Sequence, residues 1–304
     1  MNSYYYKFSD FLKQKYGEKV WKISLDAGFS CPNCNEHGKE GCIFCRNDSF
    51  SELGSQQNKT VREQMQRGIA LAQTRFHINK YLAYFQASTN TFAPIHVLEA
   101  TYRAALEFLG VVGLSISTRP DCLPNGVLNL IKDISHETDL WIELGLQSSH
   151  DTTLKRINRG HTYNDYLTAV EKLKPLNVRI CTHIMIGLPG ETRDDMLWTA
   201  ERLAHLGIHE IKIHPLLVLK DTGLGEMFQR NKYSALSQSE YVTMLCDVLE
   251  RLPEDMVIQR LTAEAPEEML LAPHWSLNKL AVLNEIHQEF KRRNSRQGLK
   301  FASS

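Results

Sequence analysis

Short apolar segments alternate with longer amphipathic segments along most of the chain. The short segments are rich in Val, Ile, Leu and Tyr, and several are apolar almost throughout, which is typical of strands buried on both faces. They lie at residues 19–28, 80–88, 112–118, 139–148, 178–187 and 210–218. The longer segments carry apolar residues at i, i+3, i+4 and i+7, and this period predicts helices. They lie at residues 60–76, 94–110, 123–137, 163–177 and 191–207.

This alternation predicts an α/β architecture. Repeated β-then-α units indicate a parallel sheet with helices on its outer face. Six units fall short of the eight of a closed barrel, so the sequence predicts an open, partial (β/α)6 TIM-like barrel. A doubly wound sheet is the alternative.

The pattern changes near the C-terminus. A capping box at Ser237 and Glu240 begins one more helix, at residues 237–252. After it come a strand-like segment at 255–266 and a helix-like segment at 276–298. We therefore predict a core at residues 1–252 and a small α+β extension, residues 253–304, packed on that core.

Composition indicates an ordinary globular protein. The chain has 304 residues, 35 acidic and 35 basic side chains, and an apolar fraction of 42%. Its first residues lack the apolar region of a secretory signal, and no apolar run approaches the roughly 18 residues of a membrane span. We expect a cytoplasmic protein without a membrane partner, in which clustered cysteines bind metal more often than they form disulfides. The zero net charge leaves nucleic-acid binding open.

Four of the seven cysteines lie in one segment, residues 29–50, directly after the first predicted strand. They form two C-x-x-C pairs, Cys31 with Cys34 and Cys42 with Cys45. The segment leaves the carboxyl end of a strand, where barrels carry their active sites. Four thiolates would hold a structural zinc ion, although such sites usually separate their pairs by about a dozen residues or more. Three thiolates would instead hold a [4Fe–4S] cluster with one iron open to a ligand.

A family resemblance covers almost the whole chain. CPNCNEHGKEGCIFC is followed by FQASTNTFAP, LSISTRPDCLP, IELGLQSSHDTTLKRINRGHT, IMIGLPGET and IKIHPLLVLKDTGL. These segments resemble, in order, those of the radical S-adenosylmethionine superfamily, and more narrowly the YhcC/YtqA-like family related to the catalytic subunit of Elongator. The resemblance implies a partial barrel of the radical S-adenosylmethionine type with Cys31, Cys42 and Cys45 as cluster ligands. Cys34 departs from the family pattern and is expected beside the cluster, although spacing alone leaves it open as a ligand.

The same resemblance implies the cofactors and the chemistry. S-Adenosylmethionine would chelate the open iron through its methionyl amine and carboxylate. One electron from the reduced cluster, delivered by an external flavodoxin- or ferredoxin-like donor, would cleave the sulfonium C–S bond. The resulting 5′-deoxyadenosyl radical would abstract hydrogen from a substrate, while the protein positions and shields the reactants.

Polar residues near the ends of the predicted strands are the candidates for holding S-adenosylmethionine. Glu143 and Gln147 alternate with apolar neighbours, so both are predicted to face the barrel interior, and His183 and His214 face inward by the same alternation. A buried ion pair of Glu143, with Arg159 or Lys212, is the alternative to a cofactor contact. By resemblance, the cofactor-binding residues are Gln86, Ser88, Thr89, Asn90, Ser117, Arg119, Glu143, Gln147, Arg159, Ile186, Gly187, His214 and Leu216.

The substrate is the least specified part of the function. Relatives in the Elongator group act on the wobble uridine of tRNA, so the resemblance makes tRNA a candidate partner. Basic residues near the C-terminus are candidates for phosphate contacts, with a solvated helix face as the alternative. They are Lys279, Lys291, Arg292, Arg293, Arg296 and Lys300. A small-molecule or protein substrate is the alternative among enzymes, and a zinc-binding scaffold protein is the alternative of another class.

Overall fold

Seven parallel strands form the central sheet. The computed structural model describes residues 4–34, 41–46, 59–86 and 88–302. The strand order is β1-β2-β3-β4-β5-β6-β8, and every neighbouring pair is parallel. The strands are β1 (Val20–Leu25), β2 (Lys80–Phe85), β3 (Val111–Thr118), β4 (Asp139–Gln147), β5 (Arg179–Ile186), β6 (Glu210–Pro215) and β8 (Val257–Arg260).

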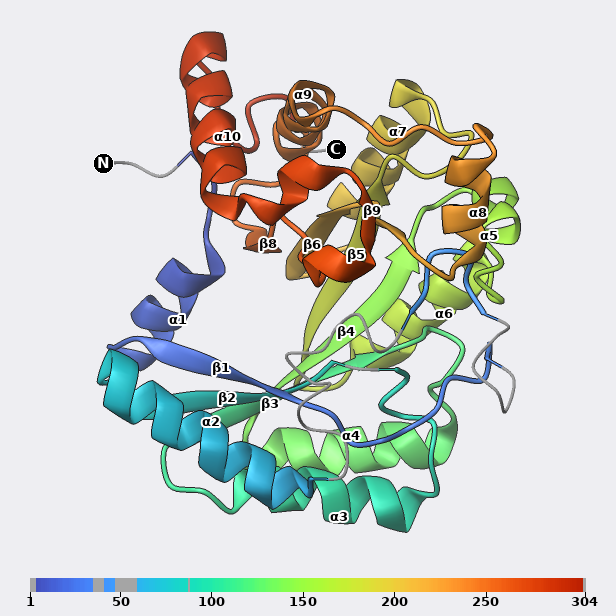
Figure 1. The fold of residues 1–304 in the computed structure, drawn as a ribbon. Helices are drawn as coiled ribbons and strands as arrows, with labels where there is room; N and C mark the ends of the chain where they lie inside the picture. The colour runs from blue at the N-terminus through green and yellow to red at the C-terminus, as the bar shows by residue number, and fades with distance from the viewer. Residues whose placement is uncertain (1–3, 35–40, 47–58, 87, 303–304) are drawn as a thin grey trace.

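Helices cover the outer face of this curled sheet (Figure 1). Each new strand is added on the same side of the one before it, so the sheet is wound in one direction only. This order confirms the predicted partial barrel over a doubly wound sheet. The helices are α1 (Phe8–Tyr16), α2 (Val61–Phe76), α3 (Ile95–Leu106), α4 (Asn125–Glu137), α5 (Asp151–Arg156), α6 (Tyr163–Leu173), α7 (Arg193–Ala204), α8 (Gly223–Gln229), α9 (Gln238–Leu249) and α10 (Lys279–Arg293).

The main apolar core lies between the sheet and the helices. It joins alternate strand residues such as Ile142 and Ile180 to helix residues such as Leu98 and Tyr166, all fully buried. Burial of this apolar surface is the main force that holds the helices on the sheet. The opposite, concave side of the sheet is left for polar side chains.

Local sequence signals fix where several helices begin. Helices α2, α6, α7 and α9 start with a complete capping box, in which a Ser or Thr hydroxyl and an acidic side chain three residues later satisfy free backbone N–H groups. The box predicted at Ser237 and Glu240 is present. The predicted strand at 210–218 is divided, with β6 followed by the two-residue β7 (Val218–Leu219).

The last fifty residues contribute to the sheet itself. Strand β8 pairs with β6, while β9 (Leu270–Ala272) pairs with β7 in a small antiparallel sheet. The N-terminal segment joins them, since Ile258 N donates to Tyr6 O at 2.8 Å and Gln297 N donates to Tyr4 O at 2.9 Å. The proposed boundary at residue 252 remains a prediction. Among the described residues, no helix combines the length and apolarity needed to cross a bilayer.

Candidate active site

A cavity opens where the strands end and the cysteine segment meets the sheet. Its wall combines the cysteine segment, the ends of strands β2 to β6 and β8, and residues 263–265. The carboxyl ends of parallel strands converge at one edge, so side chains far apart in the sequence meet there. The predicted site residues that line the cavity are Cys31, Cys42, Cys45, Gln86, Ser88, Thr89, Ser117, Arg119, Glu143, Gln147, Arg159, His214 and Leu216.

Three predicted cofactor residues do not line this cavity. The Asn90 amide donates to Ser117 O at 3.1 Å, inside the protein. Ile186 belongs to the main apolar core, and Gly187 O accepts a hydrogen bond from the Tyr233 hydroxyl. Their predicted contacts with S-adenosylmethionine therefore remain predictions without support from the cavity.

All four cysteines of the segment face the cavity together. Each C-x-x-C pair forms a tight turn, with Cys34 N donating to Cys31 O at 3.0 Å and Cys45 N donating to Cys42 O at 2.9 Å. Burial, with the neighbouring Cys31 and Cys42, raises the pKa of Cys34 to about 11. Burial and the other cysteines likewise raise the pKa of Cys45 to about 12. Thiolates this close repel one another unless a cation binds them, so the group has the character of a metal site.

Two donors are directed at the sulfur of Cys42. The Arg159 guanidinium lies 3.4 Å from Cys42 Sγ and the Asn33 amide lies 3.6 Å from it. Arg159 also donates to Gly145 O at 2.6 Å, and a Cβ at Gly145 would lie 2.6 Å from that guanidinium. The glycine in IELGLQ thus leaves room for Arg159 against the strand. Hydrogen bonds to a ligating sulfur tune the charge of a metal centre.

The floor of the cavity is a buried charge network centred on Glu143. Its fully buried carboxylate accepts from Lys22 at 2.8 Å, from Ser115 at 2.5 Å and from Lys212, and His183 Nε2 lies 2.8 Å away. Burial alone would raise the pKa of Glu143, but Lys212 and Lys22 hold that pKa well below its usual range. The pair with Lys212 weighed from the sequence is therefore present, and Glu143 already has partners within the protein.

The same network contains a second group of possible metal ligands. Ligand atoms of Glu143, Cys181 and His183 lie within 4.8 Å of one another. However, the ammonium groups of Lys22 and Lys212 already bind this carboxylate. Two positive charges in contact with Glu143 disfavour a cation, so we assign no metal to this group.

Unlike Glu143, the side chain of Gln147 has a buried polar atom without a hydrogen-bond partner among the described residues. The strand pairing of β4 shifts between Gly145 and Gln147, and Gln147 adopts a φ of 79°. Its side chain lines the cavity, yet its buried Oε1 has no hydrogen-bond donor among the described residues. A buried carbonyl oxygen without a donor is costly, so this atom is suited to a ligand that carries N–H or O–H groups.

Several wall residues were missed by the sequence interpretation. Tyr84 lies on β2, two positions before Gln86, and its hydroxyl accepts a hydrogen bond from Lys212 at 2.9 Å. The two-residue alternation of strands was the signal that could have found it. Arg260, at the end of β8, also lines the cavity, but a single charge in a four-residue strand gives no periodic signal.

Comparison with known protein families decides among the metal sites that four thiols allow. The family described as "Radical SAM superfamily" matches residues 30–203, and "Radical_SAM C-terminal domain" matches residues 208–292. The chain belongs to the radical S-adenosylmethionine superfamily. A [4Fe–4S] cluster and S-adenosylmethionine are therefore its cofactors, and the zinc-scaffold alternative is wrong.

Three known proteins are similar to this radical S-adenosylmethionine enzyme. The uncharacterized protein YtqA of Bacillus subtilis is 40% identical over 297 residues, covering 97% of this chain and 92% of YtqA. A tRNA uridine(34) acetyltransferase of Methanocaldococcus infernus is 26% identical over 163 residues, covering 53% of this chain and 30% of that protein. The solved structure of Elp3 from M. infernus has a TM-score of 0.72 at 18% identity, covering 91% of this chain and 64% of Elp3.

The cavity of this radical S-adenosylmethionine enzyme fits its cofactors. Gathered thiols with raised pKa values suit a cationic cluster, and the unpaired oxygen of Gln147 suits the amine or hydroxyl groups of S-adenosylmethionine. Cys34 lines the same cavity as the three predicted ligands, which agrees with the expectation that it lies beside the cluster.

Proposed function

We propose that Cys31, Cys42 and Cys45 hold the cluster, and that the adjoining cavity holds S-adenosylmethionine and an organic substrate. The observation that supports this assignment is the continuity between the thiols and a walled cavity that Gln147 also lines, with a buried Oε1 that has no donor among the described residues. The bound cofactors would supply a carbon-centred radical that abstracts hydrogen. The residues of this chain would bind the reactants, orient them and exclude water.

The wall offers groups suited to each of these tasks. Gln147 would accept a hydrogen bond from the cofactor, and Ser88 and Thr89 would offer hydroxyl groups at the end of β2. Phe44, Met185 and Leu216 supply apolar wall, which favours exclusion of water from a reactive intermediate. Arg159 would stabilise negative charge on the cluster through the sulfur of Cys42, a different role from the direct cofactor contact that the resemblance implied.

We propose uridine in tRNA as the substrate. The support is the relative named as a tRNA uridine(34) acetyltransferase, whose matched region covers about half of this chain. An electron must also reach the cluster, so we infer an external flavodoxin- or ferredoxin-like donor. The thiolate ligands require reduced cysteines, which agrees with a cytoplasmic location.

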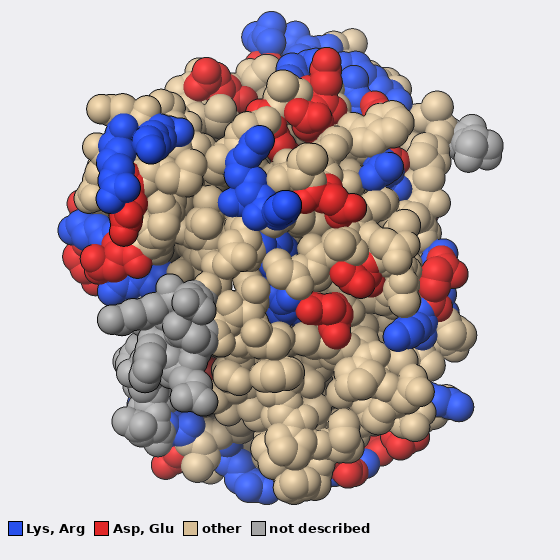
Figure 2. Space-filling model, turned by 90° about the vertical axis from the view of Figure 1, so that its right-hand side faces the viewer, with Lys and Arg blue, Asp and Glu red and all other residues tan. Residues whose placement is uncertain are grey.

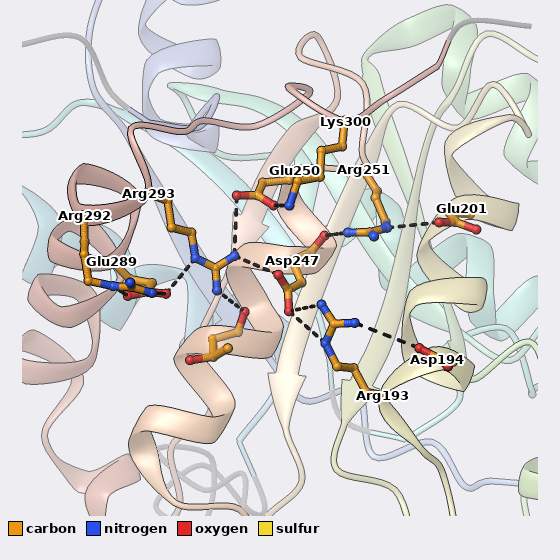
Figure 3. Close-up of polar contacts among 11 residues, drawn as sticks. Arg193, Asp194, Glu201, Asp247, Glu250, Arg251, Glu289, Arg292, Arg293 and Lys300 are labelled. Atoms are coloured by element: carbon orange, nitrogen blue, oxygen red, sulfur yellow. Dashed lines mark hydrogen bonds and ion pairs between the residues drawn. The ribbon is translucent and has the colours of Figure 1, made fainter.

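Two of the C-terminal basic residues are already paired with carboxylates. Arg293 is bound by Asp247 at 2.8 Å and by Glu289 at 2.6 Å, and its side chain is only 14% exposed (Figure 3). Arg292 pairs with Glu289 at 2.7 Å. Paired guanidinium groups are poor phosphate ligands unless their partners are displaced. Contacts with RNA would then come chiefly from the rim of the cavity.

Figure 2 shows the side of the molecule toward which β1 and β4 run in Figure 1. Basic side chains occur on its rim and near its centre, with acidic side chains interspersed among them. A mixed surface of this kind supports a limited electrostatic footprint on RNA. It also favours a second candidate function, a radical reaction on a small molecule that is bound by the cavity alone.

The test is a comparison of modified nucleosides in total tRNA, by mass spectrometry, between cells with and without the gene. The tRNA proposal predicts a change at a wobble uridine derivative, restored by the wild-type gene but not by a Cys42→Ala variant. An unchanged profile, together with cleavage of S-adenosylmethionine by the reconstituted protein, would favour the small-molecule alternative. Absence of that cleavage in a protein with an intact cluster would count against the radical function.

A further inference from the structure

Three arginines lie on the wall of the cavity, and they differ in their partners. Arg119 binds Asp121 at 3.0 and 2.8 Å and Arg159 O at 2.7 Å. Arg159 binds Gly145 O and the sulfur of Cys42. Arg260 has neither a hydrogen-bond acceptor nor a carboxylate within ion-pair distance in the part of the chain that the structure describes. A partly buried guanidinium without an acceptor forgoes its strongest interaction, so this position calls for a ligand.

The surroundings of Arg260 add positive charge. In the sheet, Arg260 on β8 lies opposite Lys212 on β6. Lys212 and Lys22 share the single carboxylate of Glu143, so that buried group holds one positive charge more than negative. Such an excess favours an anion in the adjacent space.

Two histidines complete this part of the wall. The rings of His183 and His214 lie with centroids 5.6 Å apart, and both line the cavity. Burial and then Lys212 lower the pKa of His183 to about 4, so its ring stays neutral near neutral pH. Burial, followed by Arg260, also holds the pKa of His214 well below its usual range. Both rings are therefore uncharged near neutral pH, and the positive charge of this part of the wall comes from Arg260, Lys212 and Lys22.

One carboxylate near this wall is engaged elsewhere. Glu264 lines the cavity, but its carboxylate pairs with Lys279 at 3.1 Å, and both side chains are about half exposed. The wall formed by β6, β8 and residues 263–265 therefore keeps its positive character.

We propose that this wall binds an anionic oxygen group of the substrate, a phosphate or a carboxylate, with Arg260 as its principal ligand. The inference rests on the proposed use of the cavity for substrate. A nucleotide phosphate and the acid group of a small molecule share this chemistry. A guanidinium binds either one with paired, charge-assisted hydrogen bonds.

The test is calorimetric titration of the anaerobic protein carrying its cluster and S-adenosylmethionine. The probes are inorganic phosphate, succinate, and uridine 5′-monophosphate compared with uridine. We expect the wild type to bind anions, and Arg260→Gln to bind them at least about tenfold more weakly, because a charge-assisted contact is lost. Arg260→Lys should retain part of the affinity. Arg67→Gln, which changes an exposed arginine on α2, should bind like the wild type.

The outcomes separate this proposal from the proposed function. A preference for the monophosphate over uridine would identify a phosphate source, and a preference for succinate would identify a carboxylate. Failure of the wild type to bind any probe, or equal binding by Arg260→Gln, would overturn the anion site even if S-adenosylmethionine is still cleaved. If Arg260→Gln loses affinity for S-adenosylmethionine to the same extent as affinity for the anions, Arg260 is a ligand of the cofactor and the proposal is wrong. If Arg260→Gln unfolds, the anion affinity of Arg260→Lys is compared with that of the wild type, and equal affinities would overturn the anion site.

Discussion

At the scale of single residues, the side chains that line the cavity differ in whether they have hydrogen-bond partners within the protein. Glu143 receives hydrogen bonds from two lysines and a serine, whereas Gln147 Oε1 receives none among the described residues. Both were expected from the sequence to contact S-adenosylmethionine. Their environments differ, so we propose that Glu143 stabilises the fold and that Gln147 contacts the cofactor.

Substitution should reveal this difference. Gln147→Ala should weaken binding of S-adenosylmethionine by about 1–2 kcal/mol, roughly tenfold, with little change in stability. Glu143→Ala leaves the ammonium groups of buried Lys212 and partly buried Lys22 without a carboxylate and should lower the free energy of unfolding by about 3–5 kcal/mol. Binding by calorimetry and denaturant unfolding measure the two effects, with exposed Gln73→Ala as the control. Equal loss of stability in both cavity variants would contradict the division.

The cysteines form the second prediction at this scale. Replacing Cys31, Cys42 or Cys45 singly by Ala should abolish visible iron–sulfur absorbance and cleavage of S-adenosylmethionine, whereas Cys34→Ala should retain most of both. The expectation follows the C-x10-C-x-x-C spacing. Cys246→Ala, in the buried face of α9, controls for loss of a thiol. If Cys34→Ala loses the cluster while Cys31→Ala keeps it, the ligand assignment is wrong.

At the scale of elements, a charge network fastens α10 to α9 and α7 (Figure 3). Asp247 on α9 and Glu250 directly after it are almost fully buried, and they pair with Arg193 from α7, Arg293 from α10 and Lys300 after it. Buried carboxylates are costly unless they are paired, so each helix depends on the others.

The two neighbouring arginines of α10 offer a matched comparison. Arg293→Ala should lower the free energy of unfolding by roughly 2–4 kcal/mol, because it leaves buried carboxylates with fewer partners. Arg292→Ala, whose side chain is 72% exposed, should change that free energy by no more than about 1 kcal/mol. Denaturant unfolding followed by circular dichroism measures both. Similar losses for the two variants would show that pairing with Asp247 and Glu250 contributes little.

At the scale of the whole molecule, stability depends on groups whose pKa values differ between the folded and unfolded chain. Hydrogen bonds from Arg292, then from Arg293, lower the pKa of Glu289 from 4.5 to about 2. Stability from this depressed carboxyl is present above pH 4.5 and is lost as the pH falls toward 2. Burial is the chief cause that lowers the pKa values of His161 and His183 from 6.5 to about 4. The unfolded chain therefore takes up more protons than the folded chain as the pH falls through that interval, and stability declines.

The free energy of unfolding should therefore decline with acid in two overlapping intervals, from pH 6.5 to 4 and from pH 4.5 to 2. Thermal unfolding at successive pH values measures the decline, with visible absorbance recorded in parallel to detect loss of the cluster. Glu289→Gln should make the decline in the lower interval shallower, because other paired carboxylates such as Glu143 also contribute there, and should leave the upper interval unchanged. A decline confined to the pH at which the cluster is lost would contradict this account.

The sequence predicted the elements better than the contacts between them. Alternating periods located the six strands β1 to β6, and the capping box at Ser237 marked where a helix begins, because these signals are local. The partners of Glu143 come from distant parts of the chain, with Lys22 separated from it by 121 positions. Likewise, the unpaired oxygen of Gln147 depends on an irregular strand pairing, and the isolation of Arg260 depends on which carboxylates fail to reach it.

The placement of β8 bears on how the protein is made. The sheet is completed by residues 257–260, which also bind the backbone of the N-terminal segment at Tyr6. During synthesis, the ribosome must therefore release nearly the entire chain before β6 gains its outer neighbour. Until then β6 exposes an unpaired edge, the part of a sheet most prone to pairing with other chains. We expect the nascent protein to depend on chaperones until its last quarter emerges, and C-terminal truncations to aggregate while losing few residues of the cavity.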